Sequence, residues 1–228
     1  MIIWRVTKAA FEERRLNMLR CILWLFCCQA VLAEEWNCSA TSGKYTLSSD
    51  CVVNSQVEVT GSLNITGVPE ANGGVLPKII GGGSNRLFKV ENGGELVVKV
   101  LNLTGGIASS SGNSCPASCG GAVMVSSARF TSIDSTVAGN NAQLNGGGVY
   151  ATTNSFVNIM DSDVNLNRAE TRGGGIFMND KSEILVSNSK ISKNTAPYGA
   201  GILQDQGSLR VTNSIIESNG DIHTKQGG

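Results

Sequence analysis

Residues 146–176 show most clearly the repeat that indicates the fold: GGGVYATTNSFVNIMDSDVNLNRAETRGGGI. A glycine cluster opens the stretch, apolar and polar residues then alternate, a polar block follows, and a second glycine cluster closes it. The same order recurs along the C-terminal half of the chain. Its glycine clusters begin at Gly120, Gly146, Gly173, Gly199 and Gly227, at intervals of 26, 27, 26 and 28 residues. A period of this length is typical of solenoid and array proteins.

The segments between the glycine clusters have the alternation of β-strands with one buried face. Residues two positions apart recur at matching places in four units: Phe130/Ser132, Val157/Ile159, Ile184/Val186 and Leu209/Val211. No unit has the three-and-four spacing of an amphipathic helix, which disfavours helical and leucine-rich repeats. We therefore expect an all-β solenoid in which each coil takes 26–28 residues.

A polar block with the pattern [DN]-S-x-[VI]-x-x-N recurs in four successive units. Its first positions are Asp134, Asp161, Asn188 and Asn213, and its last positions are Asn140, Asn167, Asn194 and Asn219. Stacked coils place equivalent residues about 4.8 Å apart, so we expect both rows to stack as a structural ladder, in which the asparagines hydrogen-bond through their side-chain amides. Because asparagine and glycine tolerate a left-handed backbone, we expect both rows and the glycine clusters at coil corners. Small residues after the second row suit inward positions: Ala142, Ala169 and Ala196.

These motifs resemble the repeats of the right-handed parallel β-helix (pectin-lyase-like) superfamily, and most of all those of polymorphic outer membrane proteins. Two marks carry the likeness, a Gly-Gly-[Ala/Ile]-[Leu/Ile/Val] cluster and a Phe-x-x-Asn element. Gly120-Gly121-Ala122-Val123 matches the first mark. Where the second mark has phenylalanine, this chain has Val137, Val164, Ile191 and Ile216. The resemblance covers residues 120–228 and implies a single-stranded right-handed parallel β-helix with regular coils from residue 120.

Upstream of the regular coils, shorter alternating segments indicate earlier and less regular ones. They are Val57-Glu58-Val59, Leu63-Asn64-Ile65, Leu87-Phe88-Lys89-Val90, Leu96-Val97-Val98 and Leu101-Asn102-Leu103. We therefore expect the β-helix to span residues 57–228 and residues 34–56 to cap its N-terminal end, since an open coil exposes strand edges. Gly227-Gly228 opens a new unit and stops. This predicts a truncated chain; the alternative is a genuine end that a partner or a second copy covers by self-association.

The first 33 residues are predicted to be a signal peptide. Met18-Leu19-Arg20 forms a short positive start, residues 21–32 are apolar, and Val31-Leu32-Ala33 offers a cleavage point. A start at Met18 and a start at Met1 both stay open, and an uncleaved signal anchor is the alternative. Residues 21–33 are too short for an ordinary spanning helix, and no later stretch is long and apolar enough. We expect a secreted or cell-surface protein.

Four cysteines follow the leader, an even number that favours disulfides in a secreted chain. Of the three possible pairings we favour the local one, Cys38 with Cys51 and Cys115 with Cys119. A zinc site is the alternative, and it is disfavoured because these separations do not form paired CxxC motifs. Three sequons are candidates for N-glycosylation, at Asn37, Asn64 and Asn102.

Composition and charge exclude several classes of function. The 18 basic residues balance the 18 acidic ones and form no cluster in the body of the chain, so an electrostatic footprint for nucleic acid is missing. His223 is the one histidine, which excludes a multi-histidine metal site. We expect no cofactor. A calcium ion bridging Asp134 and Asp161 on adjacent coils is a minor alternative, because two carboxylates make a thin site.

The nearest approach to a catalytic cluster lies within one unit: Asp161, Asp163, Arg168 and Arg172. Enzymes of the fold that this chain resembles use carboxylates with a basic partner. Asp161 belongs to the repeated corner row, however, and Asp163 then remains as a lone surface acid, so we assign no catalytic residue. An aromatic row at Tyr150 and Phe177, continued by Leu203, is expected to stack in the wall of the solenoid rather than to bind sugar.

The expected function is that of a secreted or cell-surface β-helix with a structural or adhesive role, which presents long faces to extracellular glycans or surface proteins. The alternative is a polysaccharide lyase or glycoside hydrolase whose active site is weakly represented or lies beyond Gly228. Enzymatic activity is therefore left open but not favoured. A non-functional gene fragment is a third possibility.

Overall fold

The computed structural model describes residues 34–69, 74–111 and 114–220. Within these ranges all regular structure is β, with twenty-four strands and no helix. The predicted signal peptide, His223 and the Gly227-Gly228 pair lie outside the described residues. The chain divides between Ala33 and Glu34, and the fold described below is that of the second unit alone.

The strands form four sheets in which every pairing is parallel. Sheet A contains, in order, β1 (Glu34–Glu35), β2 (Gly43–Leu47), β5 (Ser62–Gly67), β8 (Glu95–Lys99), β12 (Arg129–Ile133), β16 (Phe156–Met160), β20 (Glu183–Ser187) and β23 (Ser208–Thr212). Sheet B contains β3 (Cys51–Val53), β6 (Lys78–Gly81), β9 (Asn102–Thr104), β13 (Thr136–Ala138), β17 (Asp163–Asn165), β21 (Lys190–Ser192) and β24 (Ile215–Glu217).

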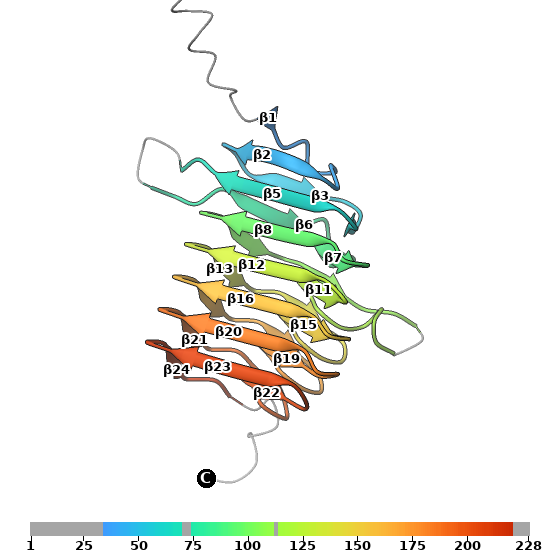
Figure 1. The fold of residues 1–228 in the computed structure, drawn as a ribbon, viewed down its shortest axis with the longest axis vertical. Coiled ribbons are helices and arrows are strands. Elements are labelled where there is room, and N and C mark those ends of the chain that lie inside the picture. Colours follow the sequence, from blue (N-terminus) through green and yellow to red (C-terminus); the bar gives the residue numbers. More distant parts are fainter. Residues whose placement is uncertain (1–33, 70–73, 112–113, 221–228) are drawn as a thin grey trace, which may run out of the picture. The chain divides into compact units, whose positions relative to one another are not determined.

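Sheet C contains β4 (Val57–Val59), β7 (Phe88–Glu91), β11 (Val123–Ser126), β15 (Val149–Thr152), β19 (Ile176–Met178) and β22 (Ile202–Gln204). Sheet D is short and contains β10 (Ile107–Ala108), β14 (Asn141–Ala142) and β18 (Arg168–Ala169). From β4 onward, each round of the chain visits sheets C, A and B in the same order, as in β11, β12 and β13 and then β15, β16 and β17. Figure 1 shows the strands of sheet A as a stack of rungs in sequence order. The expected all-β architecture with solenoid-like parallel sheets is confirmed.

The register of these sheets explains the alternation in the sequence. Phe130 pairs with Val157, which pairs with Ile184, so equivalent residues of successive units form one column. All three side chains are buried, whereas the residue that follows each of them along its strand is more exposed. Ser132 is a polar member of the neighbouring column, and its hydroxyl lies 3.2 Å from that of Ser162. The buried hydroxyl therefore has a hydrogen-bond partner, as buried polar groups generally do.

The glycine clusters lie where the chain turns into sheet C, and two of their positions accept only glycine. Gly146 has a φ of +65°, in the left-handed region that side chains avoid. At Gly147, a Cβ would collide with the backbone carbonyl oxygens of Arg168 and Gly174 in the next coil. The spacing of the glycine clusters thus reflects both a turn in the backbone and the close approach of successive coils.

The two polar rows occupy corners, although their backbones differ from the expectation. Asp134, Asp161, Asn188 and Asn213 have φ between +47° and +50°, as expected of corner residues. The second row, Asn140 to Asn219, does not carry the left-handed turn. The preceding residue does so instead, with φ of +67°, +56°, +56° and +53° at Gly139, Leu166, Lys193 and Ser218. The asparagine side chain is therefore needed at this corner for its hydrogen bonds and not for its backbone freedom.

Residues 34–56 form the first edge of the stack. Strand β2 pairs with β5 in sheet A, and β3 pairs with β6 in sheet B. Trp36 is buried in the hydrophobic core, and its ring stacks on that of Phe88 with centroids 5.9 Å apart. The predicted cap thus contributes strands and core side chains to the sheets that it adjoins.

Candidate functional site

The asparagine row forms a continuous buried column of hydrogen bonds. The Asn140 side-chain amide donates to Oδ1 of Asn167 at 3.0 Å, and Asn167 and Asn194 donate to the next asparagine at the same distance. Each of these amides also donates to a main-chain carbonyl of the preceding coil, as Asn167 does to Val137 at 2.9 Å. The side chains of this column are occupied by the fold and are not available to a ligand.

A second column, of serines, joins the coils at the other polar corner. The Ser162 hydroxyl accepts the backbone N–H of Ser135 at 3.1 Å and donates to the Met160 carbonyl at 2.6 Å. Ser189 and Ser214 repeat this pattern. Sequence reasoning recognised the repeated serine but assigned the stacking to the neighbouring Asp/Asn row. In the structure the serines connect the coils, and the Asp/Asn side chains make no hydrogen bond or ion pair with the described residues.

The Asp/Asn row lines a shallow groove of about 380 Å³ that runs across four coils, which we call the corner groove. It is lined by Asp134, Ser135, Thr136, Asp161, Ser162, Asp163, Asn188, Ser189, Lys190, Asn213 and Ile215. The three aspartates are exposed. Lys190 pairs with Glu217 at 2.7 Å, and the hydrogen bond that the Lys190 ammonium donates to Glu217, followed by the charge of Glu217, raises the pKa of Lys190. The groove is therefore acidic, with its one lysine already paired.

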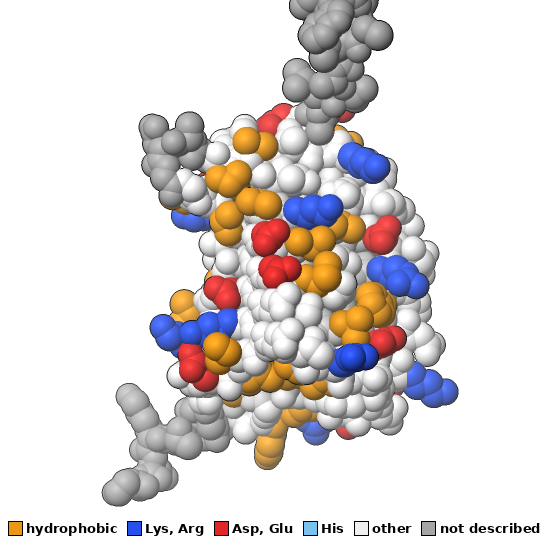
Figure 2. Space-filling model, turned by 60° about the vertical axis from the view of Figure 1, so that its left-hand side comes forward, with side chains coloured by type: hydrophobic (Ala, Val, Ile, Leu, Met, Phe, Trp, Pro, Cys, Tyr) orange, Lys and Arg blue, Asp and Glu red, His pale blue; other side chains and the backbone are white. Residues whose placement is uncertain are grey.

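The predicted cluster of acids and arginines is only partly brought together. Asp161 and Asp163 line the corner groove, whereas Arg168, in β18, and Arg172 do not. The described residues contain no group of three or more His, Cys, Asp or Glu side chains that could hold a metal ion. Figure 2 shows acidic and basic side chains interspersed over one face of the molecule, with no large patch of either sign.

The aromatic row lies on the outward side of sheet C and is covered. Tyr150 and Phe177 stack with ring centroids 5.5 Å apart and an interplanar angle of 7°. They form a small buried cluster with Met124 and Cys119, and Leu203 packs against it. With only 5% of Tyr150 and 2% of Phe177 exposed, these rings cannot act as a platform for a sugar.

The predicted disulfide pairing is confirmed, with Cys38 bonded to Cys51 and Cys115 to Cys119. The three sequon asparagines differ in their surroundings. Asn37 lies exposed in a turn, where its Oδ1 accepts the backbone N–H of Ala40 at 2.8 Å, and Asn64 and Asn102 lie half-buried within β5 and β9. In the part of the chain that the structure describes, no helical segment has the length and hydropathy needed to cross a bilayer.

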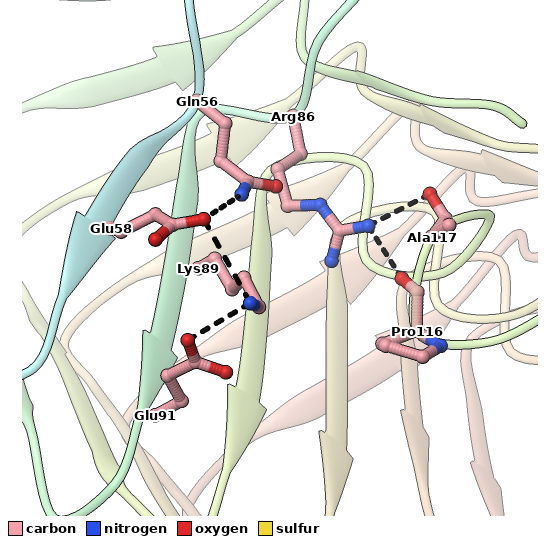
Figure 3. Close-up of polar contacts among 7 residues, drawn as sticks. All are labelled: Gln56, Glu58, Arg86, Lys89, Glu91, Pro116 and Ala117. Atoms are coloured by element: carbon pink, nitrogen blue, oxygen red, sulfur yellow. Dashed lines mark hydrogen bonds and ion pairs between the residues drawn. The ribbon is translucent and has the colours of Figure 1, made fainter.

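Sequence reasoning missed a polar recess of about 260 Å³ around Arg86, which we call the Arg86 recess. The guanidinium donates from Nη2 to the carbonyls of Pro116 and Ala117, at 2.5 and 2.8 Å, as Figure 3 shows. Beside it, Lys89 pairs with Glu91 at 2.9 Å and with Glu58 at 3.8 Å. No motif indicates this recess, because Arg86 occurs in none of the repeated patterns and its partners are main-chain atoms about thirty residues away.

Comparison with family models, with curated proteins and with solved structures found no match for this chain.

Proposed function

We propose that this protein is a secreted or cell-surface right-handed parallel β-helix of the pectin-lyase-like kind, most similar to polymorphic outer membrane protein repeats, with an adhesive role. Its ligand is an extended, uncharged glycan, which binds along the corner groove. Secretion and glycosylation at Asn37, Asn64 or Asn102 belong to this proposal. The two disulfides support secretion, since such bonds persist in oxidising compartments.

The observation that carries the proposal is the repetition of exposed polar groups along the corner groove. Asp134, Asp161, Asn188 and Asn213 come from four successive coils and lie in one row. Because the serine column connects the coils, these carboxylates and amides keep their hydrogen-bonding capacity for a ligand. A row of equivalent groups matches a ligand that is itself extended and repetitive.

The charge of the corner groove selects among glycans. Asp134, Asp161 and Asp163 are carboxylates that accept hydrogen bonds from hydroxyl groups, and Lys190 is paired with Glu217. Like charges repel, so an acidic polysaccharide is disfavoured. A hydroxyl-rich, uncharged chain meets acceptors without this penalty.

A glycan array with a groove variant tests the proposal. In the double variant Asp161→Asn, Asp163→Asn the first change is conservative, because asparagine occupies the equivalent corner at Asn188. We expect the wild-type chain to bind one or more uncharged glycans, and the double variant to bind about tenfold more weakly, since hydrogen bonds to charged groups are worth roughly 1.5–3 kcal/mol.

The matched control is Asp205→Asn, which removes one exposed acid outside the corner groove and should leave binding unchanged. Equal weakening by the control would show that net charge, and not the groove, determines binding. If no glycan binds the wild-type chain, the proposed function is wrong.

One observation favours the enzymatic alternative enough to test it, namely that Asp161 and Asp163 share one groove. Incubation with acidic and neutral polysaccharides distinguishes the two functions. A binding protein leaves the polymers intact, whereas release of unsaturated or reducing sugars that is lost in the double variant would establish a lyase or hydrolase.

A further inference from the structure

A buried arginine with an incomplete set of partners defines a second polar site, separate from the corner groove. Arg86 precedes β7 and is only 5% exposed. Its Nη2 donates to two carbonyls of residues 116–117, but its Nη1 is buried without a hydrogen-bond partner among the described residues. A buried polar group without a partner costs roughly 1–3 kcal/mol, and more when it is charged.

The charge of Arg86 is also uncompensated. Among the described residues, Lys89 and Lys190 form ion pairs with carboxylates. No carboxylate in this part of the chain lies within ion-pair distance of Arg86. Burial, as the main cause, lowers the pKa of Arg86 to about 10, and the charge of Glu91 opposes this effect only in part. An isolated buried charge is costly unless it is paired.

The surroundings of Arg86 are those of a binding site rather than of a sealed core. Polar side chains of Gln56, Ser84, Asn85 and Ser109 line the recess together with Arg86 and Lys89. Glu58 and Glu91 do not line it, and both are engaged by Lys89, as Figure 3 shows. The cation that remains available to an anion is the guanidinium.

We propose that the Arg86 recess binds an oxyanion group, a carboxylate or a sulfate, through the guanidinium of Arg86 and the amide and hydroxyl donors around it. The planar guanidinium suits such groups, and hydrogen bonds between charged partners are roughly twice as strong as neutral ones. The site shares no lining residue with the corner groove, so it does not depend on the proposed glycan function.

Calorimetric titration with sodium sulfate and with sodium acetate, each at constant ionic strength maintained with chloride, tests this site. We expect saturable one-to-one binding of at least one anion to the wild-type chain. Preference for sulfate would identify a tetrahedral group as the ligand and preference for acetate a planar carboxylate. If neither anion binds saturably, the proposal is overturned.

Two arginine variants locate the binding. Arg86→Gln should weaken it by about tenfold or more, because a charge-assisted hydrogen bond is lost. Arg129→Gln removes an equal charge from an exposed arginine that lies over the ring of Phe156, and should change the affinity by less than about twofold. Unchanged affinity in Arg86→Gln would contradict the proposal.

Arg86 also holds the loop at residues 116–117, so Arg86→Gln must first be compared with the wild-type chain by near-ultraviolet circular dichroism. If that variant does not fold, Lys89→Met decides the question. It leaves the contacts of Arg86 intact but deprives Glu58 and Glu91 of their counter-ion, so their repulsion should weaken anion binding several-fold. An affinity equal to that of the wild-type chain would then exclude an oxyanion in this recess.

Discussion

At the scale of single residues, the buried asparagine column explains how one coil recognises the next. Asn167 is fully buried, and its side chain donates to Val137 and Asn194 while accepting from the backbone and the side chain of Asn140. A shift of one coil by a single residue would break all four hydrogen bonds. The column therefore specifies the register of the coils as well as stabilising them.

Replacement of one asparagine in the column tests this role. Asn167→Ala leaves the N–H of Asn140 and the Asn140 amide without their acceptor, and we expect the free energy of unfolding to fall by about 3 kcal/mol. Urea denaturation measures the change. Asn165→Ala, a half-buried neighbour on β17, is the control and should cost less than about 1 kcal/mol. Equal losses in the two variants would refute the importance of the column.

At the scale of elements, the two disulfides fasten the first edge of the stack and the loop before β11. Cys38–Cys51 connects the turn after β1 to β3, with Cα atoms 5.9 Å apart. Cys115–Cys119 closes a short loop before β11, with Cα atoms 5.3 Å apart, and this loop carries the carbonyls that hold Arg86. One disulfide thus secures the first edge of the stack and the other secures a wall of the Arg86 recess.

The lengths of the closed loops predict different contributions to stability. A cross-link restricts the unfolded chain more when it closes a longer loop, and the sequence separations are 13 and 4 residues. We expect the double variant Cys38→Ala, Cys51→Ala to lose about 3 kcal/mol and Cys115→Ala, Cys119→Ala to lose about 2 kcal/mol in urea denaturation. A larger loss in the second variant would show that contacts of the loop, and not chain entropy, dominate.

At the scale of the whole molecule, the described stack has the energetics of a one-dimensional array. Each coil contacts its neighbours, as β16 contacts β12 and β20, so a coil in the interior has two interfaces and a coil at an edge of the sheets has one. Among the described residues, the last members of the columns lie in β22, β23 and β24, where Val211, Ile215 and Ile216 are 37%, 56% and 48% exposed. Protection should therefore decline from the middle of the stack toward this edge.

Hydrogen exchange followed by mass spectrometry measures this gradient in amide protection. We expect the amides of β12 and β16 to exchange most slowly and those of β23 and β24 to exchange at least about tenfold faster, because local opening at an edge breaks fewer contacts. Uniform protection along the stack would indicate one global unfolding event and would contradict the array description.

Much of the architecture could be predicted because the same sequence motifs recur in each coil. The interval between glycine clusters corresponds to the length of one coil. The paired positions Val157/Ile159 belong to buried columns, and the local cysteine pairs form the two disulfides. The left-handed turn before Asn167 could not be predicted, since Leu166 has no preference for that backbone and adopts it because the neighbouring coils determine the path.

The β-solenoid character, the coil period and the positions of the polar rows could be read from the sequence alone, because they follow from a side-chain period that every unit repeats. Two features follow from the tertiary structure alone: serines connect the coils while Asp134 and Asp161 line a groove, and Arg86 donates to the carbonyls of residues 116–117. The physical reason is that main-chain carbonyls have the same chemistry at every residue. Which of them meets a given side chain depends on the path of the chain in space.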